Sequence, residues 1–130
     1  MLRASLMSTR SVVSVVDDSE SVRESLPDLL RQVGYDVEAF ASAEEFLASG
    51  APSATNCLIL DVGLPGMSGP DLQQELRHRG STIPIVFITA LGDDASLRRR
   101  LTANGAAAVL FKPFTDTTLL EAVEAALKTR

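Results

Sequence analysis

Short apolar runs alternate with amphipathic segments along the 130 residues of the chain. The runs are rich in β-branched residues and predict five strands, at 12–16, 35–40, 57–60, 83–89 and 107–111. After each run, apolar residues recur at helical spacing, as at Val22, Leu26 and Leu30. This strand–helix alternation, repeated five times, predicts a parallel sheet with helices on both faces and right-handed crossovers.

Capping signals set the expected helix boundaries. Ser19 is expected to cap the first helix, which Gly34 ends, and Ser42 with Glu45 matches a capping box that opens the second. Residues 50–56 are expected to be loop. The remaining helices are predicted over 71–78, from Asp93 or Asp94 to the C-cap signal at 104–105, and from Thr115 or Asp116 to 127.

Composition indicates a globular protein with one domain. The length fits a single domain, and no repeat, low-complexity tract or linker divides it. Hydrophobic residues make up 45% and charged residues 22%, which is ordinary for a soluble protein. We expect residues 1–10 to form a flexible N-terminal tail and residues 11–130 to form the domain.

Charge and cysteine content narrow the possible partners. The net charge of −5 disfavours direct nucleic acid contact by this segment, because phosphate contacts need a basic surface. No apolar stretch approaches the roughly 18 residues that span a membrane. Cys57 is the single cysteine, so no intramolecular disulfide can form, which fits a reducing compartment. The chain is therefore expected to be cytoplasmic, with no membrane partner.

Polar residues stand where four of the predicted strands end. These are Asp17 and Asp18, Asp61, Thr89, and Lys112. Ligands of an open parallel sheet bind at the carboxyl ends of its strands, so we expect these side chains to meet. Three carboxylates repel one another unless a cation compensates, and Mg²⁺ is the natural one, because no His/Cys cluster suggests zinc. A metal, an ammonium and a hydroxyl around one carboxylate suit phosphoryl transfer onto that carboxylate.

Four segments, each at the end of a predicted strand, together resemble a known family. They are VVDDS (15–19), LILDVGLPGMSG (58–69), FITA (87–90) and FKPF (111–114). In this order the chain, from about 12 to 127, resembles the receiver domain of bacterial two-component response regulators. The flanks SAEEFL (42–47) and KPFTDTTLLEAV (112–123) resemble the branch typified by the nitrogen-fixation regulator FixJ. The resemblance implies a single doubly wound (βα)5 domain of α/β class, flavodoxin-like, with strand order 2-1-3-4-5.

The resemblance also implies roles for the residues around Asp61. Asp61 would be the phosphoacceptor, taking a phosphoryl group from a sensor histidine kinase or phosphotransfer protein in a reaction that needs Mg²⁺. Asp18 would bind the metal directly, and Asp17 directly or through water. Asp61 and the backbone carbonyl of Gly63 would complete the protein's ligands. Such a domain is not an enzyme; at most it catalyses its own phosphorylation and dephosphorylation.

The remaining implied roles lie on the last two strands. Lys112 would pair with the phosphoryl oxygens, Thr89 would move to hydrogen-bond the phosphoryl group, and the peptide bond before Pro113 is cis in similar proteins. Receivers usually carry an aromatic residue three positions before the lysine, and here that residue is Val109. Leu91, two positions after the threonine, is expected to cover the approach to the phosphoacceptor. Because Val109 stands in the aromatic position, this chain departs from the usual threonine–aromatic switch.

Receivers of this kind often form homodimers through their fourth helix, fifth strand and fifth helix. Taken alone, the run Arg98–Arg100 fits a solvated helix face; the resemblance would instead place it on this surface, opposite Glu121 and Glu124. The switch would control an output domain or a partner, and FixJ-type relatives usually carry a DNA-binding domain. The predicted function is therefore phosphorelay signal transduction leading to transcription regulation.

Other interpretations compete with this one. Taken alone, Asp17 and Asp18 also fit helix capping, Asp61 a turn, and Lys112 a surface loop. Phosphatases of the haloacid dehalogenase type need a second acid two residues after the nucleophile, where this chain has Gly63. A flavodoxin would need a Ser/Thr/Gly-rich first loop, and this one is acidic. A receiver-like interaction module that works without phosphorylation remains the main alternative.

Overall fold

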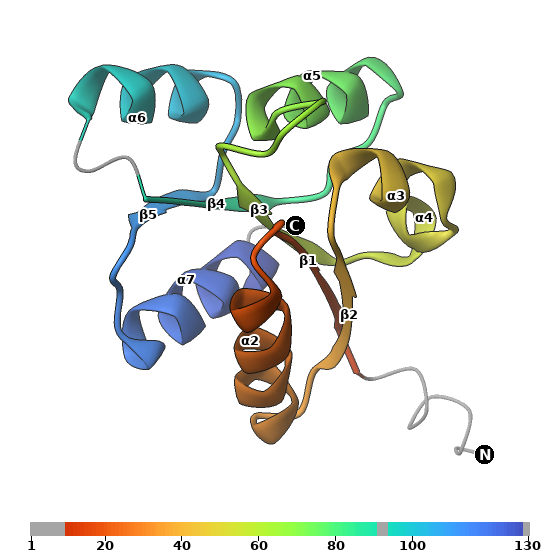
Figure 1. The fold of residues 1–130 in the computed structure, drawn as a ribbon, viewed down its shortest axis with the longest axis vertical. Coiled ribbons are helices and arrows are strands. Elements are labelled where there is room, and N and C mark those ends of the chain that lie inside the picture. Colours follow the sequence, from red (N-terminus) through yellow and green to blue (C-terminus); the bar gives the residue numbers. More distant parts are fainter. Residues whose placement is uncertain (1–9, 91–93, 129–130) are drawn as a thin grey trace.

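Five parallel strands form the centre of the computed structural model, which describes residues 10–90 and 94–128. The strands are β1 Val12–Val16, β2 Asp36–Phe40, β3 Cys57–Asp61, β4 Ile85–Thr89 and β5 Ala108–Phe111. They lie in the order β2-β1-β3-β4-β5, and every neighbouring pair is parallel. The predicted fold class, a doubly wound flavodoxin-like sheet, is confirmed (Figure 1).

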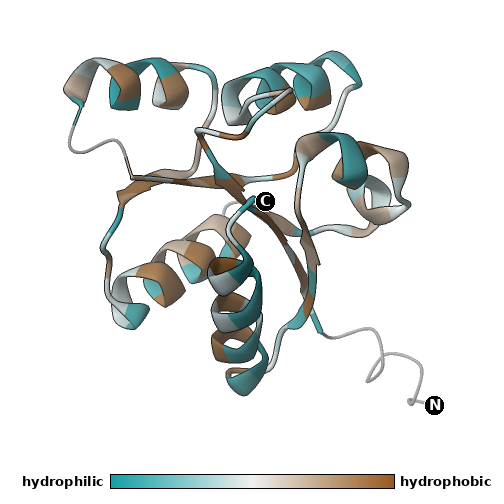
Figure 2. Ribbon diagram, viewed as in Figure 1, coloured by the Kyte–Doolittle hydropathy of each residue, from teal (hydrophilic) through white to brown (hydrophobic). Residues whose placement is uncertain are grey.

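Helices cover both faces of this sheet. Figure 1 shows α2 and α7 below the sheet, α5 and α6 above it, and α3 and α4 at the right, beside β2. The helices are α2 Glu20–Gln32, α3 Ala43–Ala48, α4 Ala51–Ala54, α5 Gly69–His78, α6 Ala95–Ala103 and α7 Asp116–Lys128. Figure 2 shows that the strands are largely apolar, whereas the helices alternate between apolar and polar residues. This pattern is expected for strands buried on both sides and helices buried on one.

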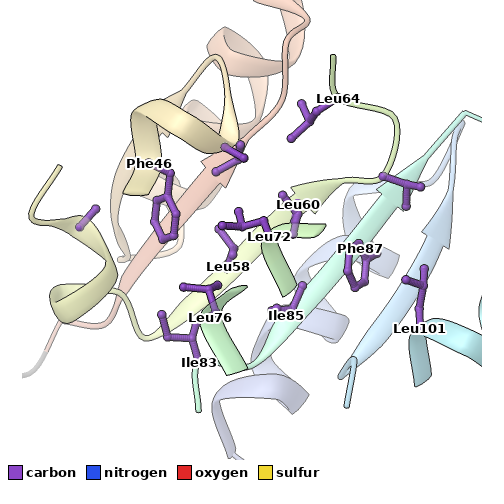
Figure 3. Close-up of a cluster of buried hydrophobic side chains, with 14 of the residues drawn as sticks. Phe46, Leu58, Leu60, Leu64, Leu72, Leu76, Ile83, Ile85, Phe87 and Leu101 are labelled. Atoms are coloured by element: carbon purple, nitrogen blue, oxygen red, sulfur yellow. The ribbon is translucent and has the colours of Figure 1, made fainter. Parts of the chain in front are cut away.

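The core consists of two clusters, one on each face, because successive strand residues point to opposite sides. Leu58 and Leu60 of β3 pack with Phe46 of α3 and Leu72 of α5 (Figure 3). The alternate residue Ile59 lies in the other cluster, with residues of α2 and α7. All five residues of β3 are buried, so Asp61 ends a strand that lies at the centre of the sheet.

Several element boundaries differ from the sequence predictions: β2 and β5 begin one residue later, β3 and α7 end one residue later, and three differences are larger. The expected loop 50–56 contains the one-turn helix α4, which begins with Pro52 in its first turn. Proline is preset for that position, and one turn is too short to show helical periodicity. Strand β4 begins at Ile85 rather than residue 83, and α5 begins at Gly69 rather than residue 71.

The capping predictions are confirmed in part. Ser42 accepts a hydrogen bond from the backbone N–H of Glu45 at 3.1 Å, which is one half of the predicted capping box; the Glu45 side chain accepts from the N–H of Ala41 and not from that of Ser42. Ser19 occupies the N-cap position of α2, as predicted, but its side chain makes no hydrogen bond to the helix N-terminus. The predicted position is therefore right and the predicted capping hydrogen bond is wrong. The Ser19 backbone N–H donates to a carboxylate oxygen of Asp17 at 2.8 Å instead. Asp94 caps α6, while Asp93 lies outside the described residues.

The predicted tail at residues 1–10 lies almost entirely outside the described residues, which begin at Arg10. Within the described residues, no helix has the length and apolar character needed to cross a lipid bilayer.

Candidate functional site

The strand ends gather the predicted residues around one pocket. Asp17 and Asp18 follow β1, Asp61 ends β3, Thr89 ends β4, and Lys112 follows β5. All five line a pocket of about 270 Å³, together with Ser19, Gly63 and Ala90. Residues that are up to 95 positions apart in sequence thus meet at the carboxyl edge of the sheet, as the parallel topology requires.

The three acids form a compact cluster. Asp17, Asp18 and Asp61 each offer a carboxylate oxygen, and these three oxygens lie within 4.8 Å of one another. Asp17 is fully buried and Asp61 is 8% exposed, whereas Asp18 is exposed. Burial is the largest cause that raises the pKa of Asp61, and the charge of Asp17 raises it further. The charge of Lys112 and the hydrogen bond from the N–H of Gly63 lower the pKa of Asp61 in part. The ionised form of Asp61 is therefore less favourable in this site than it is in water.

Lys112 pairs with Asp17 in this structure. Its Nζ lies 3.2 Å from Oδ2 of Asp17, whose other carboxylate oxygen accepts the Ser19 N–H. The guanidinium of Arg23 donates to the backbone carbonyl of Asp17 at 3.0 Å. Asp17 is thus held on three sides, and its side chain has a fixed orientation. The peptide bond between Lys112 and Pro113 is cis, as expected.

The donor set of this pocket fits a hard divalent cation. Carboxylate oxygens of three aspartates converge within the reach of one ion, and they leave an excess of negative charge that Lys112 alone does not neutralise. Mg²⁺ binds one or two carboxylates and keeps several waters, and the exposure of Asp18 leaves room for those waters. Oxygen-only coordination of this kind does not suit zinc.

The loop after β3 is fixed closely against Asp61. The backbone N–H of Gly69 donates to the carbonyl of Val62 at 3.1 Å, which closes the loop at its base. A Cβ at Gly69 would collide with the backbone carbonyl oxygen of Asp61, so only glycine allows α5 to begin this close to the strand. By contrast, a Cβ at Gly63 would meet nothing within 4 Å.

Strand β5 lacks the usual aromatic residue but has another one. Val109 is partly buried and packs against the cluster that contains Phe87. Phe111, paired with Thr89 across the sheet, lies under the guanidinium of Arg98 from α6, at 4.8 Å from the ring centroid. Phe111 therefore does not replace the missing aromatic residue in the core; it connects β5 to α6 at the end of the strand. Leu91 lies outside the described residues.

Sequence reasoning missed two residues that shape this site. Arg23 had no motif to mark it, because its partner is a backbone carbonyl. Gly69 had a signal, since a Gly-Pro pair at the start of a helix indicates a tight approach, but the pattern alone does not name the atom it approaches.

A larger depression, of about 540 Å³, lies at the opposite edge of the sheet, near the beginnings of β1 and β2. Three of its charged groups have local partners: Arg10 lies 3.5 Å from Asp36, and Arg31 donates to the carbonyl of Val37. Size alone therefore does not identify the functional site, whereas the convergent acids and lysine do.

Comparison with known proteins gives one consistent family. The family model described as response regulator receiver domain matches residues 13–124. Nodulation protein W of Bradyrhizobium diazoefficiens is 50% identical over 119 residues, covering 92% of this chain and 52% of the relative. Response regulator protein TodT of Pseudomonas putida is 46% identical, covering 91% of this chain and 52% of the relative. The crystal structure of FixJ-N superposes with a TM-score of 0.83 at 38% identity, covering 92% of this chain and 95% of that one. The chain thus spans about half the length of these two regulators.

Proposed function

The chain belongs to the response regulator receiver domain family, and from that premise we propose that Asp61 is its phosphoacceptor. Receiver domains are signalling regulators rather than enzymes that turn over an external substrate. The observation that carries the proposal is the convergence of Asp61 with Asp17, Asp18 and Lys112 in one pocket. The domain is taken to comprise residues 11–130, preceded by a short tail.

Phosphoryl transfer would involve the carboxylate of Asp61 as nucleophile. An oxygen of Asp61 forms the new bond to phosphorus while the bond from phosphorus to the donor's histidine nitrogen breaks, and the bonding electrons leave with that nitrogen. The ammonium of Lys112 pairs with Asp17 in this structure, and it can reach the phosphoryl oxygens because it lines the same pocket as Asp61. Thr89 supplies a hydroxyl at the end of the adjacent strand, β4. These groups stabilise the charge that spreads over the phosphoryl oxygens.

We assign the divalent cation of this reaction as Mg²⁺. Asp18, Asp61 and the backbone carbonyl of Gly63 would hold the ion, with Asp17 binding directly or through water. Each oxygen of Asp17 accepts one hydrogen bond and keeps a second lone pair, which is compatible with either arrangement. When bound, the ion neutralises the acid cluster and supplies positive charge to the incoming phosphoryl group.

Phosphorylation would be read on the surface formed by α6, β5 and α7. The phosphoryl group adds a charge of about −2 beside Thr89, enough to reorganise the β4–α6 connection. The proposed partners are a sensor histidine kinase or phosphotransfer protein as donor and a second copy of the chain through this surface. Arg99 and Arg100 of α6 and Glu121 of α7 are exposed there. The output would be transcription regulation in the cytoplasm, through a further domain or a partner.

A receiver-like module that needs no phosphorylation is the second candidate. Its support is Val109, which cannot act as the usual rotating aromatic residue. The complete set of acids, threonine and lysine in one pocket favours phosphorylation over this alternative.

Intact-mass measurement after treatment with acetyl phosphate and Mg²⁺ tests the proposal. The wild-type chain should gain one phosphoryl group, Asp61→Asn should gain none, and Asp28→Asn, the same change at an exposed position of α2, should behave as wild type. Because an acyl phosphate is short-lived, beryllofluoride with Mg²⁺ provides a stable analogue, followed by NMR shifts around Thr89 and Lys112. Equal phosphorylation of the Asp61→Asn variant, or no response of the wild type to either reagent, would refute the assignment.

A further inference from the structure

Glu44, in the first turn of α3, contacts the loop that follows Asp61. Its Oε2 accepts a hydrogen bond from the backbone N–H of Met67 at 2.9 Å. The same oxygen would lie 2.8 Å from a Cβ placed at Gly66, so the carboxylate lies directly on the backbone of that glycine. The two residues are 23 positions apart along the chain, and the hydrogen bond lowers the pKa of Glu44, which keeps the carboxylate ionised.

The loop also contributes apolar side chains to the core cluster that α3 joins. Leu64 is buried in the same cluster as Ala43 and Phe46 of α3, and Met67 packs against that cluster. Figure 3 shows Leu64 at the end of this cluster, on the loop that follows β3. Glu44 therefore adds a polar contact to a loop that already has an apolar one.

Other hydrogen bonds of the loop lie nearer its ends, and the N–H of Gly63 itself donates to a carboxylate oxygen of Asp61 at 3.4 Å. The N–H of Val62 donates to the carbonyl of Ile88 at 3.0 Å, and the N–H of Gly69 closes the loop on Val62. Between these ends, Gly66 has a φ of 73°, in the left-handed region that glycine adopts at little steric cost. Glu44 contacts the loop at that point, three residues after Gly63.

We propose that Glu44 is a positioning residue that holds this loop in the geometry needed for the Gly63 carbonyl to bind the metal ion. The inference rests on the proposed function, because it concerns the metal site around Asp61. Mg²⁺ requires near-ideal octahedral geometry, so a small displacement of one oxygen ligand lowers affinity. Groups that orient ligands from outside the coordination shell typically change metal affinity by about 10–100-fold, and Glu44 acts one step further away.

Glu45 provides a matched control. It lies beside Glu44 in the same first turn of α3, so both carboxylates interact with the same helix N-terminus. Its side chain accepts from the backbone N–H of Ala41 at 3.4 Å and is not among the contacts of the β3–α5 loop. Replacing Glu45 thus removes the same charge from the same helix turn without removing the loop contact.

Titration of Mg²⁺ followed by NMR of the pocket residues tests the proposal; the chain has no Trp that could report by fluorescence. Glu44→Ala should weaken Mg²⁺ binding by about threefold to tenfold. Glu45→Ala and Glu44→Gln should stay close to wild type, since the amide oxygen of Gln still accepts from the Met67 N–H. Amide hydrogen exchange at Met67 should become faster in Glu44→Ala only.

The outcomes separate this proposal from the one on which it rests. If the wild type binds Mg²⁺ and Glu44→Ala binds it as well as Glu45→Ala does, the positioning role is refuted while the metal site stands. If affinity falls but exchange at Met67 is unchanged, the proposed route through the loop is wrong. If the wild type itself shows no Mg²⁺-dependent shifts, the metal site and this inference both fail.

Discussion

Replacing Asp61 by Asn should make the metal-free protein more stable. Asp61 is 8% exposed and shares its pocket with two other carboxylates, so its negative charge is unfavourable in the folded state. Asn has nearly the same shape, and its amide oxygen can still accept the weak 3.4 Å contact from the N–H of Gly63. The substitution therefore removes repulsion while it leaves the packing in place.

The magnitude follows from the distances. Two unit charges 4.8 Å apart repel by about 3.5 kcal/mol at an effective dielectric constant of about 20. Asp17 and Asp18 both act on Asp61, but Lys112 offsets roughly one of these repulsions, and exposed Asp18 is screened by solvent. A net gain of about 1–2 kcal/mol remains, which for a domain of this size raises Tm by about 3–12 °C.

Thermal unfolding at pH 7 with a chelator, compared across wild type, Asp61→Asn and Asp28→Asn, measures this gain. The pKa of Asp61 is raised above its ordinary value of 3.8. The charge on Asp61 therefore destabilises the folded state only at pH values above 3.8, where the carboxyl group ionises. The advantage of the Asn variant should therefore be full at neutral pH and disappear as the pH falls through the raised pKa toward 3.8. Lower stability of Asp61→Asn at pH 7, or a gain equal to that of Asp28→Asn, would refute the reasoning.

Three further predictions concern the surroundings of the site. Gly69→Ala should lower the free energy of unfolding in urea by about 1–3 kcal/mol, because the new Cβ meets a backbone carbonyl. Gly63→Ala should change the free energy of unfolding little, and equal effects of the two substitutions would contradict the geometry. Arg98→Ala should cost about 0.5–1 kcal/mol, since it removes a cation–π contact, and Arg99→Ala should cost less; the order is checked by the same assay. Addition of Mg²⁺ should raise the Tm of wild type and raise that of Asp18→Asn much less, and an equal rise would remove Asp18 from the metal site.

The strands and the site residues could be predicted because their signals are local. β-Branched runs bounded by turn residues mark strands wherever both faces are buried, and the residue that follows each run lies at the carboxyl edge. This is why the sequence predicts that Asp17, Asp61, Thr89 and Lys112 lie close together, and the structure has all four in one pocket. The same reasoning missed α4, because a single helical turn has no periodicity to detect.

The contacts made by the site residues needed the folded chain. The sequence predicted that Lys112 would lie near the acids, but only the structure shows that it pairs with Asp17 and that Asp17 also accepts from Ser19. Glu44 illustrates the same limit. In the sequence, Glu44 is simply one residue of a helix-capping sequence. No rule of sequence spacing predicts its hydrogen bond to the N–H of Met67.

By itself, then, the amino-acid sequence determined the order of the elements and the chemistry brought to one edge of the sheet, because both depend on residue type and short-range spacing. Which carboxylate Lys112 neutralises, which glycine supports Asp61 and which glutamate holds the neighbouring loop were decided by tertiary structure. Those contacts join residues 8 to 95 positions apart, and their geometry depends on how whole strands and helices pack.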